Sequence, residues 1–302
     1  MRLLHHFFAI LVFCCAASTV CAEGAPLSAR AGPERFDQGI LWRIEKPGTA
    51  PSYVFGTIHI DDARVLKLPP AVTRAFDQSR NFTLEMLTDE AANRKFVRAS
   101  RFGSGEDLPT VLGPDLYGKV AERMQERDFP DSVTRKLKPW SVMITLLLPR
   151  EQPAVILDYA LYQKAVDQKK PVFQLETIEA QIDTFDGMPM GVQVGLLESV
   201  VRHADEIATM TKALIQAYLD RDLKRMWDIN SSFTGLDPGS EKLNEVFLER
   251  VLFARNQRMT SSLVPRLHEG RAFIAVGALH LYGERGILSL LEQQGYRATR
   301  VY

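Results

Sequence analysis

Residues 53–60 read YVFGTIHI, a short apolar run that breaks at Gly56 and reaches His59 three residues later. Residues 273–283 read FIAVGALHLYG and repeat this arrangement near the end of the chain. A glycine at the end of a strand allows a sharp turn or a close approach to another segment. We therefore predict that each histidine follows a buried strand, at the sheet edge where ligands of α/β proteins bind.

The charge balance of the chain limits the classes of partner. The 302 residues include 37 Lys and Arg against 37 Asp and Glu, and 46% are hydrophobic. This apolar fraction is ordinary for a globular protein. Nucleic acids and anionic membranes attract basic surfaces, which a net charge of zero does not favour. We expect a peptide or small-molecule substrate and no nucleic acid.

The first residues, MRLLHHFFAILVFCCAASTVCAEG, have the layout of a secretory signal peptide: Arg2 near the start, an apolar run, and a small-residue ending at Ala22. We expect cleavage after Ala22 and a periplasmic or secreted product without cysteine. A lipid anchor at Cys21 is the competing interpretation, although the residues before it lack the usual leucine. No later stretch is long enough to span a bilayer, so the mature chain should have no transmembrane segment.

The remaining pattern predicts an α/β (α+β) fold. After a signal peptide at 1–22 and a flexible lead-in at 23–37, we expect a single domain over 38–302. Its ends read as strands and its middle, from about 89 to 270, as mostly helical. These patterns predict a central mixed β-sheet built from N- and C-terminal segments, with a large helical middle region that covers the site.

A third strand, NFTLEML, places Glu85 near its carboxyl end. If the three strands are neighbours, His59 and His280 converge and Glu85 joins them. Two imidazoles and a carboxylate form a metal site that leaves positions open for water and substrate. Zinc, manganese and cobalt all suit this ligand set. The same residues also allow a metal-free site in which a histidine or Glu85 is the general base.

Each glycine–histidine pair also has an ordinary explanation. A single histidine after a strand is more often a loop or core residue than a ligand, and this spacing arises by chance in many sequences. The two pairs lie outside any HExxH motif. The repetition of the pattern in the same strand context is what favours a site.

In this sequence the order and spacing of several motifs together resemble the TraB/GumN (TraB/PrgY/GumN) family, which is related to the Tiki-type metalloproteases and more distantly to erythromycin-esterase-like hydrolases. The resemblance extends from about residue 41 to 301. Its motifs are GTIH at 56–59, LEM with Glu85, KPW at 138–140, LD with Asp158, QLETIEAQI with Glu176, ARNQRM with Arg255 and Asn256, and VGALHLYGERGILSLLEQQGY ending at Tyr296. It implies an α/β core in which the two GxxH histidines and the glutamate form a metal-dependent hydrolytic site.

Three further polar residues are candidates for the site. Arg255 and Asn256 lie in a helical pattern, where they would either bridge neighbouring helices or bind a substrate carbonyl or carboxylate. Glu176 follows the short strand PVFQL. It would either orient a histidine or interact with the dipole of a following helix. Pro139 and Trp140 are expected to begin and anchor a buried helix.

Two functions from different classes follow. The first is a metal-dependent, Tiki-like hydrolase in which His59, Glu85 and His280 hold a divalent metal that activates water, while Arg255 or Asn256 stabilises the oxyanion. The second is a non-catalytic envelope protein that sequesters a peptide or a polysaccharide component. The three polar residues together favour catalysis.

Overall fold

The computed structural model describes residues 36–60, 62–148, 155–234 and 239–302. The signal peptide predicted for residues 1–22 lies outside these ranges, as does nearly all of the predicted lead-in. The strands are β1 Leu41–Glu45, β2 Ser52–Thr57, β3 Asn81–Leu84, β4 Val172–Gln174, β5 Ala272–Gly277 and β6 Arg297–Arg300.

The helices lie mainly between β3 and β5. They are α1 Ala63–Leu66, α2 Pro70–Gln78, α3 Glu90–Ala99, α4 Leu108–Gln125, α5 Asp131–Thr134, α6 Pro139–Leu147, α7 Leu157–Asp167, α8 Ile178–Asp186, α9 Met190–Arg202, α10 Ile207–Leu219, α11 Leu223–Thr234, α12 Glu241–Leu248, α13 Ala254–Glu269 and α14 Ile287–Gln293. A π-helical turn, η2 Glu249–Phe253, precedes α13, and a 3₁₀ turn, η3 Ala278–Leu281, follows β5.

The six strands form one mixed sheet in the order β4-β3-β5-β2-β1-β6. β4, β3, β5 and β2 are mutually parallel, whereas β1 pairs antiparallel with both β2 and β6 at one side. The predicted sheet from N- and C-terminal segments is therefore confirmed, since β5 pairs with β2 across most of the chain. β3 and β5 are buried at every position, as expected of parallel strands with both faces covered.

The parallel pairing brings the predicted site residues to one edge. Thr57 at the end of β2 pairs with Gly277 at the end of β5, and β3 pairs with the other side of β5. Parallel strands end at the same edge of a sheet. His59, Glu85 and His280 all follow these carboxyl ends, which confirms the predicted common edge.

Gly56 allows the segment after β5 to lie directly against β2. A Cβ atom at this position would be 2.9 Å from the Cα of Ala278, which is backbone of η3. Real Cβ atoms essentially never come this close to another backbone atom. The first glycine of the repeated pattern is therefore required by the turn that carries the second histidine.

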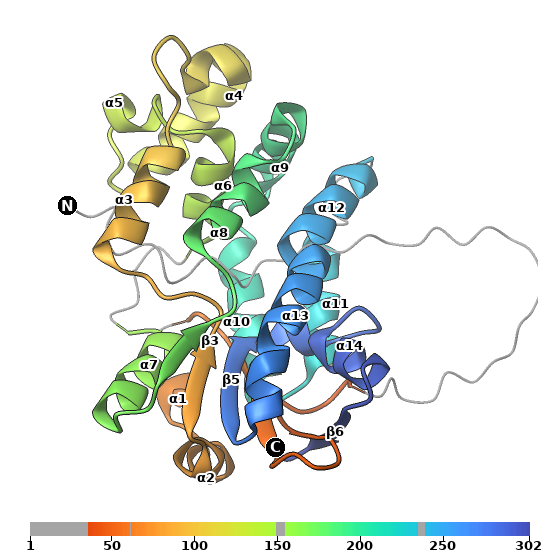
Figure 1. The fold of residues 1–302 in the computed structure, drawn as a ribbon. Helices are drawn as coiled ribbons and strands as arrows, with labels where there is room; N and C mark the ends of the chain where they lie inside the picture. Colours follow the sequence, from red (N-terminus) through yellow and green to blue (C-terminus); the bar gives the residue numbers. More distant parts are fainter. Residues whose placement is uncertain (1–35, 61, 149–154, 235–238) are drawn as a thin grey trace, which may run out of the picture.

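Much of the helical middle region lies beyond the carboxyl ends of the parallel strands, whereas α7 and α13 lie alongside the sheet (Figure 1). Figure 1 shows α3, α4, α5, α6, α8 and α9 at this end of the molecule, while α2 lies at the opposite end of the sheet. Helix α6 begins with Pro139, and the side chain of Trp140 is fully buried between Phe96 and Phe185. Pro139 and Trp140 therefore begin and anchor a buried helix, as predicted.

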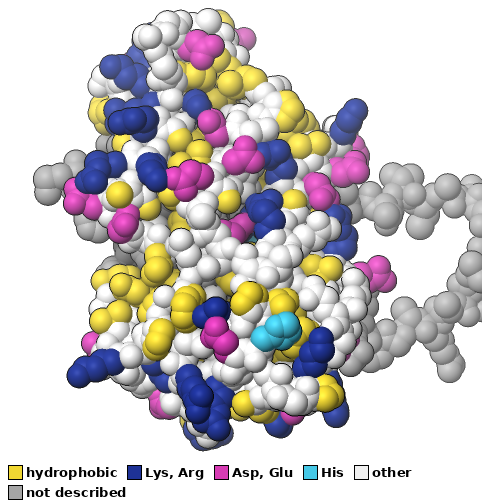
Figure 2. Space-filling model, viewed as in Figure 1, with side chains coloured by type: hydrophobic (Ala, Val, Ile, Leu, Met, Phe, Trp, Pro, Cys, Tyr) yellow, Lys and Arg dark blue, Asp and Glu magenta, His cyan; other side chains and the backbone are white. Residues whose placement is uncertain are grey.

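The surface is mixed in charge. On the face drawn in Figure 2, Lys and Arg side chains are interspersed with Asp and Glu side chains over the helical region. In the described part of the chain, no helix has both the length and the apolar character that crossing a bilayer requires.

Candidate active site at the sheet edge

Glu85 is the carboxylate around which the site is built. It is the first residue after β3, and its Oε1 accepts a hydrogen bond from the backbone N–H of Gly277 at 2.6 Å. This bond joins the ends of β3 and β5 and fixes the carboxylate beside the turn that contains His280. The side chain is 7% exposed.

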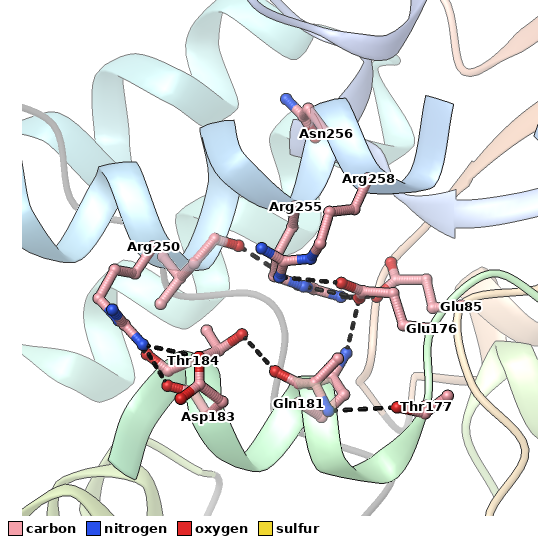
Figure 3. A network of polar contacts seen from close by, with 12 residues as sticks. Glu85, Glu176, Thr177, Gln181, Asp183, Thr184, Arg250, Arg255, Asn256 and Arg258 are labelled. Carbon is pink, nitrogen blue, oxygen red and sulfur yellow. Dashed lines mark hydrogen bonds and ion pairs between the residues drawn. The ribbon is translucent and has the colours of Figure 1, made fainter. Parts of the chain in front are cut away.

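Arg255 reaches Glu85 from helix α13. Its Nη2 donates to Glu85 Oε2 at 2.6 Å, and its Nε and Nη2 donate to Glu176 Oε2 at 2.8 and 2.6 Å. Figure 3 shows this side chain extending from α13 toward both carboxylates. The guanidinium is almost fully buried, and two buried carboxylates hold its planar fork. Helix α13 begins directly after the π-helical turn η2, a distortion often found at functional sites.

Glu176 supports Arg255, and its side-chain contacts with the described residues include neither histidine. Besides Arg255, it accepts from Gln181 Nε2 at 3.0 Å and from Arg258 Nη2 at 3.2 Å. The contacts show that Glu176 holds the arginine in place. It also stands directly before Thr177, the N-cap of α8, so the predicted interaction with that helix dipole stays a prediction. Its backbone N–H also donates to the carbonyl of Glu85, which ties the end of β4 to the end of β3.

Asn256 orients His280. Its Oδ1 lies 2.6 Å from His280 Nδ1, while its Nδ2 donates to the carbonyl of Arg285 at 2.8 Å. Because the amide oxygen only accepts, His280 Nδ1 carries the hydrogen and Nε2 has the lone pair. Nε2 lies 3.2 Å from Arg255 Nη1 and 3.8 Å from Glu85 Oε1. Both ends of the Asn256 amide are engaged, so its contacts support a positioning role, and the oxyanion role stays a prediction.

His59 is held by a different residue. Its Nε2 lies 3.0 Å from Asp158 Oδ2, and Asp158 Oδ1 accepts from the Thr57 hydroxyl at 3.0 Å. Asp158 lies in the first turn of α7. The other ring nitrogen, His59 Nδ1, is buried and has no hydrogen-bond partner among the described residues; Asp158 Oδ2 is also without one, so its contact with His59 is an ion pair.

The electrostatic environment keeps Glu85 ionised and His280 neutral. Burial alone would raise the pKa of Glu85, but Arg255, the histidines and the Gly277 N–H outweigh it and lower this pKa to about 2. Burial lowers the pKa of His280 to about 3; the Glu85 charge opposes this shift, and Arg255 adds to it. At neutral pH both groups therefore present lone pairs.

His59 is shifted in the opposite direction. Burial would lower its pKa, but the Asp158 carboxylate outweighs burial, with a further contribution from Glu85, and the pKa is raised. Glu85 therefore lies near enough to both histidines for its charge to act on each. The charge of Glu85 thus acts on both histidines of the repeated motif, which differ in basicity.

The residues present suit a divalent metal in their donor chemistry and in their supporting contacts. Each histidine has one ring nitrogen beside a side-chain oxygen, the arrangement typical of metal-binding histidines. Within the described ranges, however, no group of three His, Cys, Asp or Glu side chains is arranged to hold a metal ion as it stands. Arg255 contacts both Glu85 and His280 Nε2, and a ring nitrogen has a single lone pair. A metal on His280 Nε2 would have to replace the Arg255 contact.

Four residues of the site carry no functional signal in the local sequence: Asp158, Thr57, Gln181 and Arg258. Asp158 was visible only as part of the LD motif, and nothing in its local pattern indicates a histidine partner. A signal was present in retrospect: an acidic residue within an apolar helical start has to be paired if the start is buried.

Comparison with known proteins places the chain in a family. A sequence model of the TraB/PrgY/gumN family matches residues 40–300. The chain belongs to this family. It is 26% identical to "Metalloprotease TIKI2" of Danio rerio, over 85% of this chain and 60% of that protein. It is 24% identical to "Metalloprotease TIKI1" of Homo sapiens, over 91% and 65%.

A bacterial relative of similar length is also matched. "Uncharacterized protein YbaP" of Shigella flexneri is 23% identical, over 82% of this chain and 90% of that protein. The chain thus spans about three fifths of the length of the TIKI2 relative but nearly all of the bacterial one. No solved structure matches the chain.

Proposed function

We propose that this member of the TraB/PrgY/gumN family is a metal-dependent hydrolase that cleaves peptide or related acyl bonds, with His59, Glu85 and His280 as ligands. One observation carries the proposal. Each of the two histidines has a ring nitrogen beside a side-chain oxygen, and the charge of one ionised carboxylate, Glu85, acts on both. The printed names of the TIKI relatives agree with a protease, although their identity to this chain is low.

Zinc, manganese and cobalt all suit two imidazoles and a carboxylate. When bound, such an ion would lower the pKa of a coordinated water and so supply a nucleophile near neutral pH. Glu85 and His280 are already in the protonation states that ligands need, because their pKa values lie well below neutrality. His59 must lose its proton to serve as a ligand.

The neighbouring residues of the site hold the proposed ligands in place. Asn256 holds the hydrogen of His280 on Nδ1, so that the lone pair is on Nε2, where a metal would replace the Arg255 contact. Gly277 holds Glu85 Oε1 through its backbone N–H. Arg255 lends positive charge beside Glu85 and keeps that carboxylate ionised. Glu176 in turn keeps Arg255 in place.

The test is a metal analysis of the purified protein combined with hydrolysis assays on peptides and esters. His59→Ala and His280→Ala should lose both bound metal and activity while remaining folded, because these residues lie at a sheet edge. Glu85→Gln separates two roles: a ligand would lose metal and activity, whereas a general base would lose activity alone. His268→Ala, at an exposed position of α13, is the matched control.

If both histidine variants hydrolyse every tested substrate as well as the parent at equal metal content, the hydrolase proposal fails. The non-catalytic envelope protein that sequesters a peptide or a polysaccharide component would then be the better account.

We also propose that the protein acts in the periplasm or outside the cell, after cleavage near Ala22. The support is the sequence of residues 1–22, which has the charge, apolar run and small-residue ending of a signal peptide. Mass spectrometry of the mature protein should find Glu23 at its amino terminus. Retention of residues 1–22, or a lipid on Cys21, would contradict this.

A further inference from the structure

We infer that Asp158 is the positioning residue for His59: it holds the hydrogen of the ring on Nε2 and leaves Nδ1 as the nitrogen that binds the ligand of the site. The inference rests on the proposed function, because it takes His59 to be a working residue.

The Asp158 carboxylate is itself fixed by two neighbours. Its Oδ1 accepts from the hydroxyl of Thr57, which ends β2 two residues before His59, and its Oδ2 faces His59 Nε2 at 3.0 Å. Asp158 lies in the first turn of α7, where the helix dipole favours a negative charge. One carboxylate thus joins the helical middle region to the residues on either side of the β2 end.

The contact of Asp158 with His59 Nε2 is informative because the other ring nitrogen, Nδ1, is buried without a partner among the described residues. The imidazole is more than nine-tenths buried, and Nδ1 has no partner among the described residues. Buried polar atoms in folded proteins are nearly always hydrogen-bonded, and those that are not often mark a site for a ligand, ion or water. Asp158 Oδ2 is likewise buried and has no hydrogen-bond partner of regular geometry among the described residues. Its contact with Nε2 is an ion-pair contact at 3.0 Å, and through it Asp158 selects which nitrogen is left.

His280 provides an internal comparison. It also has one ring nitrogen beside a side-chain oxygen, that of Asn256, and its second nitrogen faces Glu85. The orienting oxygens of both histidines come from helices of the middle region, α7 and α13, while the histidines themselves follow strands. Removal of such an orienting partner typically weakens metal affinity 10–100-fold, which sets the size of the expected effect.

The experiment compares Asp158→Asn and Asp158→Ala in the full mature chain. Metal affinity is measured by calorimetric titration with Mn²⁺, Co²⁺ and Zn²⁺ separately. The histidine tautomers are measured by ¹⁵N–¹H NMR without metal, in alkaline buffer where imidazole rings are neutral, with His59→Gln to assign the signals. Asp167→Asn makes the same charge change at an exposed position of α7 and is the matched control.

The wild-type protein and Asp167→Asn should show one His59 tautomer, with the hydrogen on Nε2. Asp158→Ala should show a mixture and bind metal about 10–100-fold more weakly. Asp158→Asn should retain more affinity than Asp158→Ala, because its amide still has an oxygen that can accept from the ring.

A single tautomer and parental metal affinity in Asp158→Ala would overturn the inference, and a fall in melting temperature alone would make Asp158 a structural link between α7 and β2. If the wild-type protein binds none of the three ions, the proposed metal-dependent function fails. The tautomer measurement needs no metal, so it still decides the role of Asp158.

Discussion

The Nη2 nitrogen of Arg255 lies 2.6 Å from Glu85 Oε2, although 170 positions separate the two residues in the sequence. Both side chains are buried, and the same nitrogen also contacts Glu176. Two carboxylates therefore share one guanidinium inside the protein, together with the partly exposed Arg258 at one of them. Removal of one partner would leave an uncompensated buried charge, so each member of this network should matter for stability.

Glu176→Gln should destabilise the protein by about 3–5 kcal/mol, because it breaks a buried ion pair and leaves Arg255 with Glu85 alone. Chemical denaturation followed by circular dichroism measures the change. Glu179→Gln removes a carboxylate that pairs with Lys95 at the surface, and it should leave the transition midpoint unchanged. Equal midpoints for the two variants would show that the buried network adds nothing to stability.

Arg255→Lys should reduce activity strongly, although it keeps the positive charge. Arginine contacts Glu176 through two nitrogens and Glu85 through one of them, whereas lysine is a point charge that cannot reproduce this planar fork. Arg258→Lys, at a half-exposed position with a single contact to Glu176, is the matched control and should have a much smaller effect. Hydrolysis rates at saturating metal measure both, and equal losses would contradict a special role for Arg255.

The neutral state of His280 predicts how stability depends on pH. Its pKa is lowered from 6.5 to about 3 in the folded protein, so between these values the unfolded chain binds a proton that the folded chain does not. Stability from this group is complete above pH 6.5 and is lost as the pH falls toward 3. The difference in unfolding free energy between wild type and His280→Asn should therefore decrease on acidification.

Denaturation curves from about pH 7 to about pH 4 measure this difference. His268→Asn is the control substitution at an exposed position. A wild-type advantage over His280→Asn that stays constant across the range would show that His280 is not held neutral by its surroundings.

The sequence predicted the framework of the site better than its contacts. Strands that end at or directly before Gly56, Glu85 and Gly277 followed from local apolar runs, although β3 ends at Leu84, earlier than the predicted NFTLEML. The shared edge followed from the rule that parallel strands end together. The residues that contact the histidines could not be predicted from these patterns. Asp158 and Asn256 belong to distant helices, and hydrogen bonds between segments far apart in the chain leave no periodic signal in a single sequence.

The same limit explains Glu176 and Arg255. Their spacing indicated that they lie near the site, but whether they contact substrate, histidine or each other depends on how α8 and α13 pack. The structure pairs them with each other, which no local pattern of charge specifies. Burial of all four charged groups, Glu85, Glu176, Asp158 and Arg255, also depends on tertiary packing.

Gly56→Ala should damage the site from a position that carries no functional group. The added Cβ would lie 2.9 Å from the Cα of Ala278, so the η3 turn that contains His280 must move. Overpacking of this kind typically destabilises by about 1–3 kcal/mol, and the displacement should move His280 relative to Asn256 and Glu85. We expect a lower melting temperature and a loss of metal affinity and activity.

Gly118→Ala in α4 is the matched control, because its added Cβ would meet no atom within 4 Å and alanine favours a helix. It should keep activity and metal affinity with equal or higher stability. Parental metal affinity and activity in Gly56→Ala would show that η3 can shift without disturbing the site, and the close approach of the two glycine–histidine segments would then be a packing feature alone.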